Sequence, residues 1–442
     1  MDRRVHGGMR KMKRDVVRVG LMGLGTVGTG VYRVLQRNAE DIALRAGIPV
    51  RIEKIAVRDP GKERTVDVPK DLLTTDADSL VDDPDLDIIV EVMGGMDHTL
   101  ELLLRALRNG KSVVTANKDL IAEHGRILLE TAEAHRCDLL FEASVAGGIP
   151  IVRPLKQCLA GNRISEIMGI INGTTNYILT KMTEEGSDFA TALHQAQQLG
   201  YAEADPTSDV EGYDAARKIA ILASLAFNSW VVFPQVDVTG ITEVTDRDIR
   251  YAGELGYIIK LLAVAKQDEA EEAIEIAVRP TLVPRDHPLA AVGGAYNAIF
   301  VRGDAIGQAM FHGLGAGELP TASAVAGDVV EAVRNLRDGV RGRMLCPCYR
   351  RKTIKPIEDT RSRFYLRALV VDRPGVLGAV ATVLGQYGVS IASMLQKSSQ
   401  GDLAEIVVVT HSVRQGNLMD AVARLRDHEV VHTVHAPLHV EH

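Results

Sequence analysis

The stretch Val16–Gly28 reads VVRVGLMGLGTVG, and it predicts the fold of the first part of the chain. An apolar run typical of a strand ends at a GxGxxG pattern, which opens a helix. The first glycine permits a tight turn, the second lets a pyrophosphate approach the backbone, and the third allows close helix packing. Because a helix N-terminus also supplies amide donors and a positive dipole, we expect a dinucleotide there. The expected contacts are Gly23, Gly25, Thr26, Val27 and Gly28.

Downstream of this turn, strand and helix patterns alternate. Apolar runs at 52–57, 86–92, 112–115 and 139–144 are typical of strands, and helical stripes lie between the later ones. This order predicts an open parallel sheet with helices on both faces. The expected fold class is therefore α/β, with a doubly wound, Rossmann-type sheet.

The end of the second strand bears on the choice of dinucleotide. An NAD site usually has a carboxylate there for the ribose 2′-hydroxyl, whereas an arginine suits the 2′-phosphate of NADP. Arg58 lies at this position and favours NADP, and Asp59, one residue later, keeps NAD open.

The composition of the 442 residues excludes several classes of protein. With 46% hydrophobic and 25% charged residues, the chain is not disordered, collagen-like or a pure coiled coil. A formal charge of −7 argues against a general binder of nucleic acid. No apolar run reaches the roughly 18 residues that span a bilayer. Four cysteines without paired CxxC motifs are typical of reduced thiols in a cytoplasmic protein, and residues 1–15 lack the apolar region of a secretory signal.

The regular alternation ends near Gly147-Gly148-Ile149-Pro150, and a mixed order of helices and isolated strands follows. A helical pattern over 321–337 could return to the first sheet, and a polar, basic stretch then precedes an order of βαββαβ, the ferredoxin-like arrangement. The expected division is an extension at 1–15, a Rossmann domain at 16–149 completed by about 317–349, an α+β domain at 150–316, a linker at 350–363 and a C-terminal domain at 364–442.

Carboxylates and a lysine gather in the segment 200–218, GYAEADPTSDVEGYDAARK. Asp214 and Lys218 are four residues apart at a predicted helix start, so they share a face, and Glu203 and Asp209 lie in the loop before it. One interpretation is a solvated helix start whose acidic residues favour the dipole. The other is a site in which hydride delivery to a carbonyl leaves an oxyanion, which the lysine protonates while carboxylates hold a substrate amino group.

Lys118 follows another predicted strand, in Thr115-Ala116-Asn117-Lys118. Residues at the carboxyl end of such a strand face the ligand crevice of an open sheet. A lysine at a helix start is also electrostatically unfavourable, which favours a functional role over a plain surface position. We therefore expect Lys118 to handle a proton or orient the substrate.

Six motifs in order make the chain resemble homoserine dehydrogenase, in the form that carries a C-terminal ACT domain. They are GLGTVG, TANK, FEASVAGGIP, NGTTNYI, the segment 200–218 and GLGAGELPTA. The resemblance covers nearly the whole chain from about Val16. It implies reversible NAD(P)H-dependent reduction of L-aspartate 4-semialdehyde to L-homoserine, the branch step towards threonine, methionine and isoleucine.

The resemblance also implies residue roles. Lys218 looks like the catalytic acid/base, and Lys118 like a second catalytic lysine that contacts the nicotinamide end. Glu203, Asp209 and Asp214 look like the substrate-binding set. Further implied positions are Gly200 and Gly315 on the cofactor side, and Glu142, Val145, Gly147 and Ile149 as a site for a monovalent cation, sodium above all.

The C-terminal unit resembles an ACT domain through the turn Asp372–Leu377, DRPGVL. This implies an amino-acid effector, for which the pathway product threonine is the natural candidate. Ser390 and Ala392 stand where some effector-binding ACT domains carry an asparagine, so a purely structural role stays open. The family implies a homodimer built through the substrate domain.

Two other functions stay open at this stage. An aldehyde-oxidising semialdehyde dehydrogenase would need a nucleophilic cysteine, and neither Cys137 nor Cys158 lies in a glycine-rich turn. A non-catalytic sensor of dinucleotide and amino acid would need an output module. The sequence shows no helix-turn-helix pattern, and its lysine and carboxylate set is intact.

Overall fold

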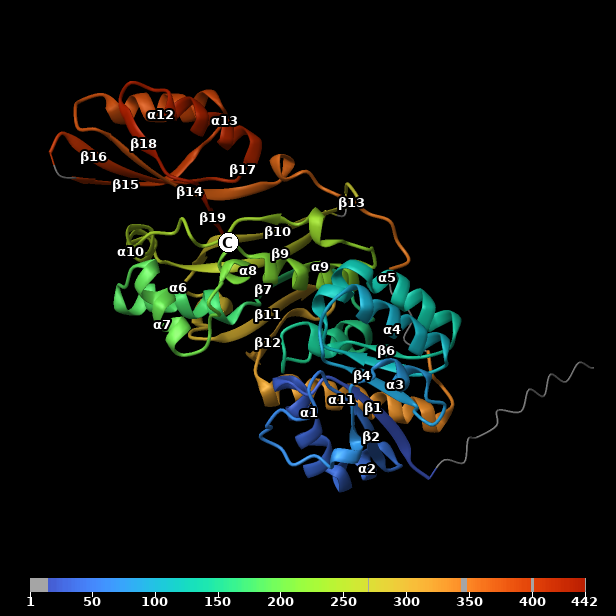
Figure 1. Cartoon of the computed structure of the whole chain (residues 1–442). Coiled ribbons are helices and arrows are strands. Elements are labelled where there is room, and N and C mark those ends of the chain that lie inside the picture. The colour runs from blue at the N-terminus through green and yellow to red at the C-terminus, as the bar shows by residue number, and fades with distance from the viewer. Residues whose placement is uncertain (1–14, 269, 343–347, 399–400, 442) are drawn as a thin grey trace, which may run out of the picture. The chain divides into compact units, whose positions relative to one another are not determined.

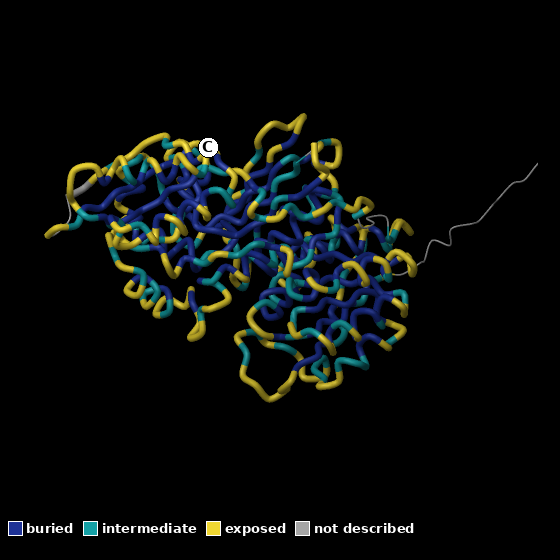
Figure 2. Tube along the Cα trace, turned by 90° about the horizontal axis from the view of Figure 1, so that it is seen from above, coloured by how far each residue is buried: buried dark blue, intermediate teal, exposed yellow. Residues whose placement is uncertain are grey.

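The computed structural model describes residues 15–268, 270–342, 348–398 and 401–441, which form two compact units. Of the described residues, unit 1 comprises 15–161, 228–230, 313–342 and 348–349, and unit 2 the remaining segments. The predicted extension at 1–15, apart from Asp15, lies outside the described residues, as does Cys346. Figure 1 shows the elements by label, and Figure 2 shows which parts of the Cα trace are buried, intermediate or exposed.

Unit 1 contains a six-stranded parallel sheet in the order β3-β2-β1-β4-β5-β6. The strands are β1 Val17–Met22, β2 Val50–Ala56, β3 Leu73–Thr74, β4 Ile88–Glu91, β5 Ser112–Thr115 and β6 Leu139–Leu140. The helices are α1 Thr26–Arg37, α2 Ala39–Ala46, α3 Asp78–Asp82, α4 Asp97–Arg108, α5 Lys118–Ala134 and α11 Glu318–Asp338. The predicted doubly wound α/β sheet is confirmed.

Helix α11 belongs to the core of this sheet although it is distant in sequence. Its Val325 and Val329 are buried in the same apolar cluster as Val19 and Leu21 of β1. At Gly30 of α1, a Cβ atom would lie 2.7 Å from the carbonyl oxygen of Glu318, so the glycine is what lets the two helices approach. The helical pattern read over 321–337 therefore packs onto the first sheet.

Unit 2 is built on a 13-stranded mixed sheet. Its first strands are β7 Ile164–Ile170, β8 Asp237–Val238, β9 Tyr257–Asp268, β10 Ala273–Pro284, β11 Tyr296–Gly303 and β12 Gly307–Leu314. The helices are α6 Gly173–Glu185, α7 Phe189–Gln198, α8 Thr207–Val210, α9 Tyr213–Phe227 and α10 Asp246–Glu254. Because α9 packs on β7, β9 and β10, the sheet positions the helix that carries Lys218.

The C-terminal part of unit 2 has the predicted βαββαβ order. It runs β14 Arg361–Val371, α12 Val376–Gln386, β15 Ile391–Ser398, β16 Leu403–Thr410, β17 Val413–Arg414, α13 Gln415–Arg426 and β18 Val431–Val434. A last strand, β19 Leu438–Val440, pairs in parallel with β10 and antiparallel with β14, so it joins the two parts into one sheet.

The segment 350–363, expected to be a linker, lies against the sheet of unit 2. It contains β13 Thr353–Ile354, which pairs in parallel with β10, and a 3₁₀ turn at Ile357–Asp359. Lys355 forms ion pairs with Asp268 at 3.1 Å and Glu271 at 2.9 Å. A two-residue strand has no periodicity that a sequence pattern could reveal, and its partner is about 80 residues away.

A buried polar cluster joins the ACT strands to α10. Arg367 on β14 lies 2.7 Å from Asp248 on α10 and 2.9 Å from Glu405 on β16, and these three side chains are at most 6% exposed. Tyr251 on α10 donates to Glu405 at 2.5 Å, and Tyr365 donates to Asp248 at 3.1 Å. Burial alone would raise the pKa values of Asp248 and Glu405, but both lie below their usual range. Hydrogen bonds from Arg367 and Thr245 lower the pKa of Asp248, and hydrogen bonds from Tyr251 and Arg367 lower that of Glu405.

Candidate active site

The glycine turn of unit 1 has the geometry that its pattern predicts. Gly23 has φ +104°, and a Cβ atom there would lie 2.8 Å from the backbone nitrogen of Met93. At Gly28 a Cβ would overlap the carbonyl oxygen of Gly23. A Cβ on Gly25, by contrast, would have no described atom within 4 Å, and Thr26 beside it is exposed. The backbone is therefore accessible where α1 begins, as phosphate binding requires.

Arg58 and Asp59 follow β2, and both are exposed. Oδ1 of Asp59 accepts a hydrogen bond from the backbone nitrogen of Gly61 at 2.8 Å, so this carboxylate is engaged in its own turn. No hydrogen bond or ion pair is found between the Arg58 guanidinium and the rest of the described chain. Of the two, Arg58 is the group available to a ligand.

Glu91, at the end of β4, organises the loops beside the glycine turn. Its Oε1 accepts from the backbone nitrogens of Met93 and Gly94, both at 2.9 Å, and its Oε2 accepts from the Thr115 hydroxyl at 2.6 Å. Burial raises the pKa of this fully buried carboxyl, and these three hydrogen bonds act in the opposite direction. Sequence reasoning missed Glu91, because a carboxylate within a strand pattern gives no sign of its partners.

The hydrogen bonds continue from Thr115 to Lys118. The Thr115 hydroxyl accepts from the backbone nitrogen of Asn117 at 3.0 Å, and the Asn117 side chain caps α5 by accepting from Leu120 at 3.1 Å. Lys118 is the first residue of α5; its side chain is 32% exposed and lies 3.7 Å from Asp119. The capped helix therefore positions Lys118 at the carboxyl end of β5.

Glu142 is the first residue of the segment 142–149, and its carboxylate forms hydrogen bonds with the backbone of the residues that follow this segment. It accepts three backbone hydrogen bonds, from Ile151 at 2.6 Å, Val152 at 2.8 Å and Arg153 at 2.8 Å. The backbone nitrogen of Glu142 in turn donates to Asp328 at 2.8 Å. The side chain of Glu142 thus supports the loop, which leaves its backbone oxygen as the atom to consider for a cation.

The other three residues expected at a cation are buried. No hydrogen-bond donor in the described part of the chain reaches the carbonyl oxygens of Val145, Gly147 and Ile149. Gly147 has φ +53°, and a Cβ there would overlap the carbonyl oxygen of Gly315, so these two segments are in close contact. Buried carbonyl groups need a partner, and oxygen atoms are what hard cations bind. Among the described residues, no group of three or more His, Cys, Asp or Glu side chains is placed so that it could hold a metal ion.

In unit 2, Asn172 joins the carboxylates to the lysine. Its Nδ2 donates to Asp209 at 2.7 Å and to Asp214 at 2.9 Å, while its Oδ1 caps α6 by accepting from Thr175 at 2.9 Å. Lys218 donates to Asp214 at 2.6 Å and to the backbone oxygen of Ile171 at 2.9 Å. Asp209, Asp214 and Lys218 are therefore brought together, as the spacing predicted for the last two.

The pKa of Asp209 is raised, chiefly by burial, although the hydrogen bond from Asn172 opposes this; the nearby negative charge of Asp214 raises it further.

Glu203 lies apart from this cluster: it is exposed after α7, and within the described chain its carboxylate has no hydrogen bond. Gly200, in the same loop, has φ +76°, and a Cβ there would meet no described atom within 4 Å.

Asn172 was missed as an individual site residue. The only signal for it was a polar turn, Asn172–Ile178, directly after a strand.

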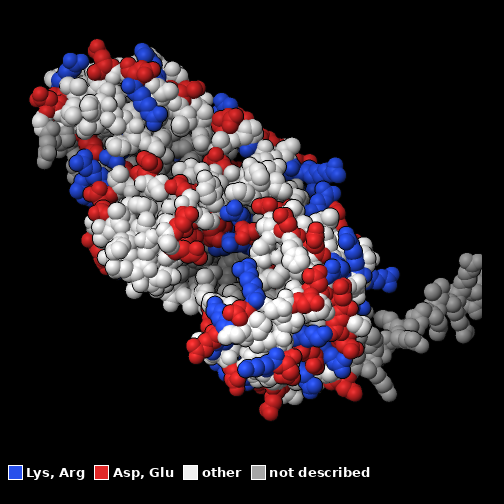
Figure 3. All heavy atoms as spheres, viewed as in Figure 1, with Lys and Arg blue, Asp and Glu red and all other residues white. Residues whose placement is uncertain are grey.

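The cysteine that an aldehyde-oxidising enzyme needs is not supported at Cys137, which is buried and whose pKa burial raises to about 11. Figure 3 shows acidic and basic side chains interspersed on the face in view, and none of the described helices is long and apolar enough to cross a membrane.

Comparison with known proteins identifies all three parts of the chain. Residues 23–142 match the family model of the homoserine dehydrogenase NAD-binding domain, 150–330 that of homoserine dehydrogenase, and 364–430 that of the ACT domain. Homoserine dehydrogenase of Bacillus subtilis is 47% identical over 427 residues, which cover 96% of this chain and 98% of that protein.

Solved structures show the same relationship. The homoserine dehydrogenase of Thiobacillus denitrificans matches with a TM-score of 0.90 and 42% identity, covering 96% of this chain and 98% of that one. A hyperthermophilic archaeal homoserine dehydrogenase, solved in complex with NADPH, matches with a TM-score of 0.60 and 29% identity over 72% of this chain and 97% of that one.

Proposed function

The chain belongs to the homoserine dehydrogenase family, and on that premise we propose how its residues carry out the reversible NAD(P)H-dependent reduction of L-aspartate 4-semialdehyde to L-homoserine. The observation that carries the proposal is the bonded set of Lys218, Asp214, Asn172 and Asp209 in unit 2. It combines one proton donor with two carboxylates, which is what an amino aldehyde requires.

Lys218 acts as the general acid. When bound, the dinucleotide would supply the hydride that reduces the aldehyde carbon. The Lys218 ammonium donates a proton to the carbonyl oxygen, and in the reverse direction its amine accepts the proton of the hydroxyl. Asp214 orients Lys218 from one turn away. Asp209 and Asp214 receive the substrate amino group, with Glu203 joining them from its loop, and Lys118 serves as a second catalytic lysine.

The cofactor is held by Gly23, Gly25, Thr26, Val27 and Gly28, with Gly200 and Gly315 as further contacts. NADP is the preferred form, because Arg58 is available at the end of β2 while Asp59 is engaged in its own turn. The NADPH complex of the archaeal relative is in keeping with this preference.

A sodium ion fits the segment 142–149. Val145, Gly147, Ile149 and Glu142 are buried residues, and their backbone oxygens have the chemistry of a hard-cation site; that of Glu142 also accepts a long hydrogen bond from the Val145 nitrogen at 3.4 Å. When bound, the ion would rigidify this segment. The three backbone hydrogen bonds to the Glu142 carboxylate hold the same loop in place from its other side.

The remaining features of the proposal concern regulation and assembly. Threonine is the proposed effector of the ACT domain at 364–442, and a homodimer is the proposed assembly. The Rossmann domain is taken as 16–149 with about 317–349, and the substrate domain as 150–316. A cytoplasmic location is also proposed, in keeping with four cysteines that lack paired CxxC motifs.

The test is homoserine-dependent reduction of NADP⁺ and NAD⁺ by the full-length protein, followed at the nicotinamide absorbance, with and without threonine. We expect turnover with both cofactors, faster with NADP⁺, and inhibition by threonine. Insensitivity to thiol alkylation would separate this enzyme from a cysteine-dependent aldehyde oxidase. A folded protein without turnover on either cofactor would overturn the proposed reaction.

A further inference from the structure

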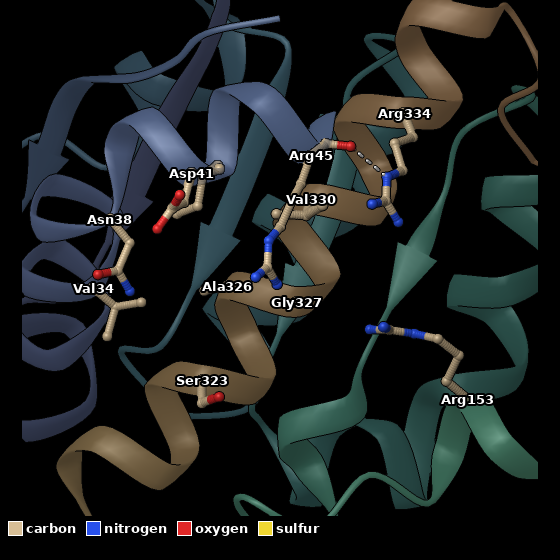
Figure 4. A pocket seen from close by; sticks show the side chains of 11 residues that line it. Val34, Asn38, Asp41, Arg45, Arg153, Ser323, Ala326, Gly327, Val330 and Arg334 are labelled. Atoms are coloured by element: carbon tan, nitrogen blue, oxygen red, sulfur yellow. Dashed lines mark hydrogen bonds between the residues drawn. The ribbon is translucent and has the colours of Figure 1, made fainter. Parts of the chain in front are cut away.

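Unit 1 contains a cavity that lies away from the glycine turn. Its volume is about 430 Å³, and it is bounded by the end of α1, by α2, by α11 and by Arg153. Its polar lining includes Asn38, Asp41 and Ser323. Gly327 lies on the α11 wall, where a Cβ would be in van der Waals contact with the Arg153 guanidinium at 3.6 Å. Figure 4 shows the lining side chains.

Three guanidinium groups face this cavity. Arg45 comes from α2, Arg334 from α11, and Arg153 from the segment after Glu142, and Figure 4 shows the three around one space. Arg153 is fixed by its ion pair with the buried Asp328 at 2.5 Å. Nε of Arg334 donates to the backbone oxygen of Arg45 at 3.0 Å, which holds the two chain segments together.

The charges of this lining are unbalanced. The negative charge of Asp328 balances the positive charge of Arg153. Among the described residues that line the cavity, Asp41 carries the one other negative charge, whereas Arg45 and Arg334 carry two positive charges. No ion pair between the Arg45 guanidinium and another described residue is found. Like charges around a shared space repel one another unless an anion lies between them. The guanidinium group of an arginine can donate two parallel hydrogen bonds to two oxygens of one phosphate group.

We propose that this cavity binds a small phosphate-bearing anion through Arg45, Arg334 and Arg153, with Ser323 as a hydroxyl donor. The site is distinct from the cofactor's phosphate site. Asn38 follows the last turn of α1, whereas the glycine turn lies at the start of this helix. At 1.5 Å per residue, the two ends are roughly 18 Å apart.

The test is titration calorimetry of the full-length enzyme, saturated with NADP⁺ so that the dinucleotide site is occupied. Inorganic phosphate and phosphoserine serve as separate probes at constant ionic strength, with chloride as the reference anion. The variants are Arg45→Ala and the double variant Arg45→Ala, Arg334→Ala. Both side chains are exposed, and the loss at Arg334 is the one hydrogen bond to the backbone of Arg45, so the fold should stay intact, which thermal unfolding of each variant checks. Arg51→Ala, on β2 and outside the cavity lining, is the matched control.

We expect saturable binding to the parent enzyme, at least tenfold weaker in the single variant, lost in the double variant and unchanged in the control. Binding of phosphoserine alone would identify the ligand as a phosphorylated metabolite, and equal binding of both probes would identify the free ion. Equal affinity in all variants would place the anion elsewhere and overturn the proposal. Absence of saturable binding of either probe to the parent enzyme would also overturn it.

Discussion

The Nζ atom of Lys218 lies 2.6 Å from Oδ2 of Asp214, one turn earlier on α9, and both side chains are at most 13% exposed. The same carboxylate oxygen accepts from Asn172 at 2.9 Å. The proton donor and the carboxylate are therefore positioned without a substrate. Such preorganisation is what makes general acid catalysis effective.

We expect Lys218→Ala to lower kcat by about 10²- to 10⁴-fold, because the alkoxide formed by hydride transfer loses its proton donor. The affinity for NADPH, measured by fluorescence titration, should stay within twofold. Lys181→Ala is the matched control, since this lysine of α6 forms an ion pair with the nearby Glu185, outside the cluster of Lys218. Near-normal turnover in Lys218→Ala would show that another group supplies the proton.

Asn172→Ala should act on both substrate binding and stability. It removes the donor between Asp209 and Asp214 and the cap of α6, which together should cost about 2–4 kcal/mol of unfolding free energy. We also expect the KM for homoserine to rise more than the KM for NADP⁺. Denaturant unfolding and initial rates measure the two effects. A variant with parent stability would mean that the network is not formed in solution.

Arg58→Ala should change cofactor choice. Loss of a charge-assisted contact to a 2′-phosphate is worth about 1.5–3 kcal/mol, so kcat/KM for NADPH should fall roughly 10- to 100-fold while that for NADH changes little. Arg51→Ala, on the strand that precedes Arg58, controls for the loss of a positive charge. Equal losses with both cofactors would assign Arg58 a role outside phosphate recognition.

Lys260, on β9, provides a test by pH. This lysine is 3% exposed, donates to Asn176 at 3.1 Å and Val292 at 2.7 Å, and burial lowers its pKa from 10.5 to about 8. Below pH 8 both folded and unfolded states are protonated, and the cost of burying the charge is fully present. Between pH 8 and about 10.4 only the unfolded state keeps the proton, so stability should rise with pH.

Relative to Lys260→Met, the parent protein should therefore gain about 2–3 kcal/mol of unfolding free energy between pH 7 and pH 10. Comparing the two proteins at each pH cancels the titration of all other groups. Parallel pH profiles would show that Lys260 stays protonated in the folded state across this range.

Local patterns predicted most of the fold. The glycine turn, the strand–helix alternation and the βαββαβ order are each set by residues near one another in sequence, as is the pairing of Asp214 with Lys218. The contact between Asn172 and Asp209 spans 37 residues, and the buried carboxylate of Glu91 reaches Thr115, 24 residues away. Such contacts depend on sheet register, which periodicity within one element does not contain.

The same limit explains the segments that sequence patterns missed. Strand β19 is three residues long, and its pairing with β10 and β14 is what makes the substrate and ACT strands one sheet. The 350–363 segment reads as a polar linker because its residues are polar, yet β13 pairs with β10. Short strands of this kind are recognised by their partners and not by their own composition.

Arg367 tests whether the ACT strands and α10 are held together by charge. Arg367→Met would leave the buried Asp248 without its cation and Glu405 with Arg247 at 3.5 Å, which should cost about 3–5 kcal/mol and raise the pKa values of both carboxyls. In the parent protein the pKa values of both carboxyls lie below normal. The stabilisation from their ionised forms is therefore present above the unfolded carboxyl pKa of about 4, and it is lost as the pH falls from there through the lower pKa values of the folded state. The variant should therefore be less stable than the parent at pH 7, and the difference should shrink at pH 3–4.

The matched control for this prediction is Arg373→Met, on the exposed turn after β14, where the arginine lies 3.6 Å from an exposed Glu429. A surface pair of this kind contributes about 0–1 kcal/mol, so this variant should unfold like the parent. Thermal unfolding with and without threonine, followed at both pH values, measures the two variants together. If Arg367→Met matched Arg373→Met in stability, the buried cluster would not hold the ACT strands to α10. If it lost stability but kept the parent's response to threonine, the cluster would stabilise the junction without transmitting the effector's signal.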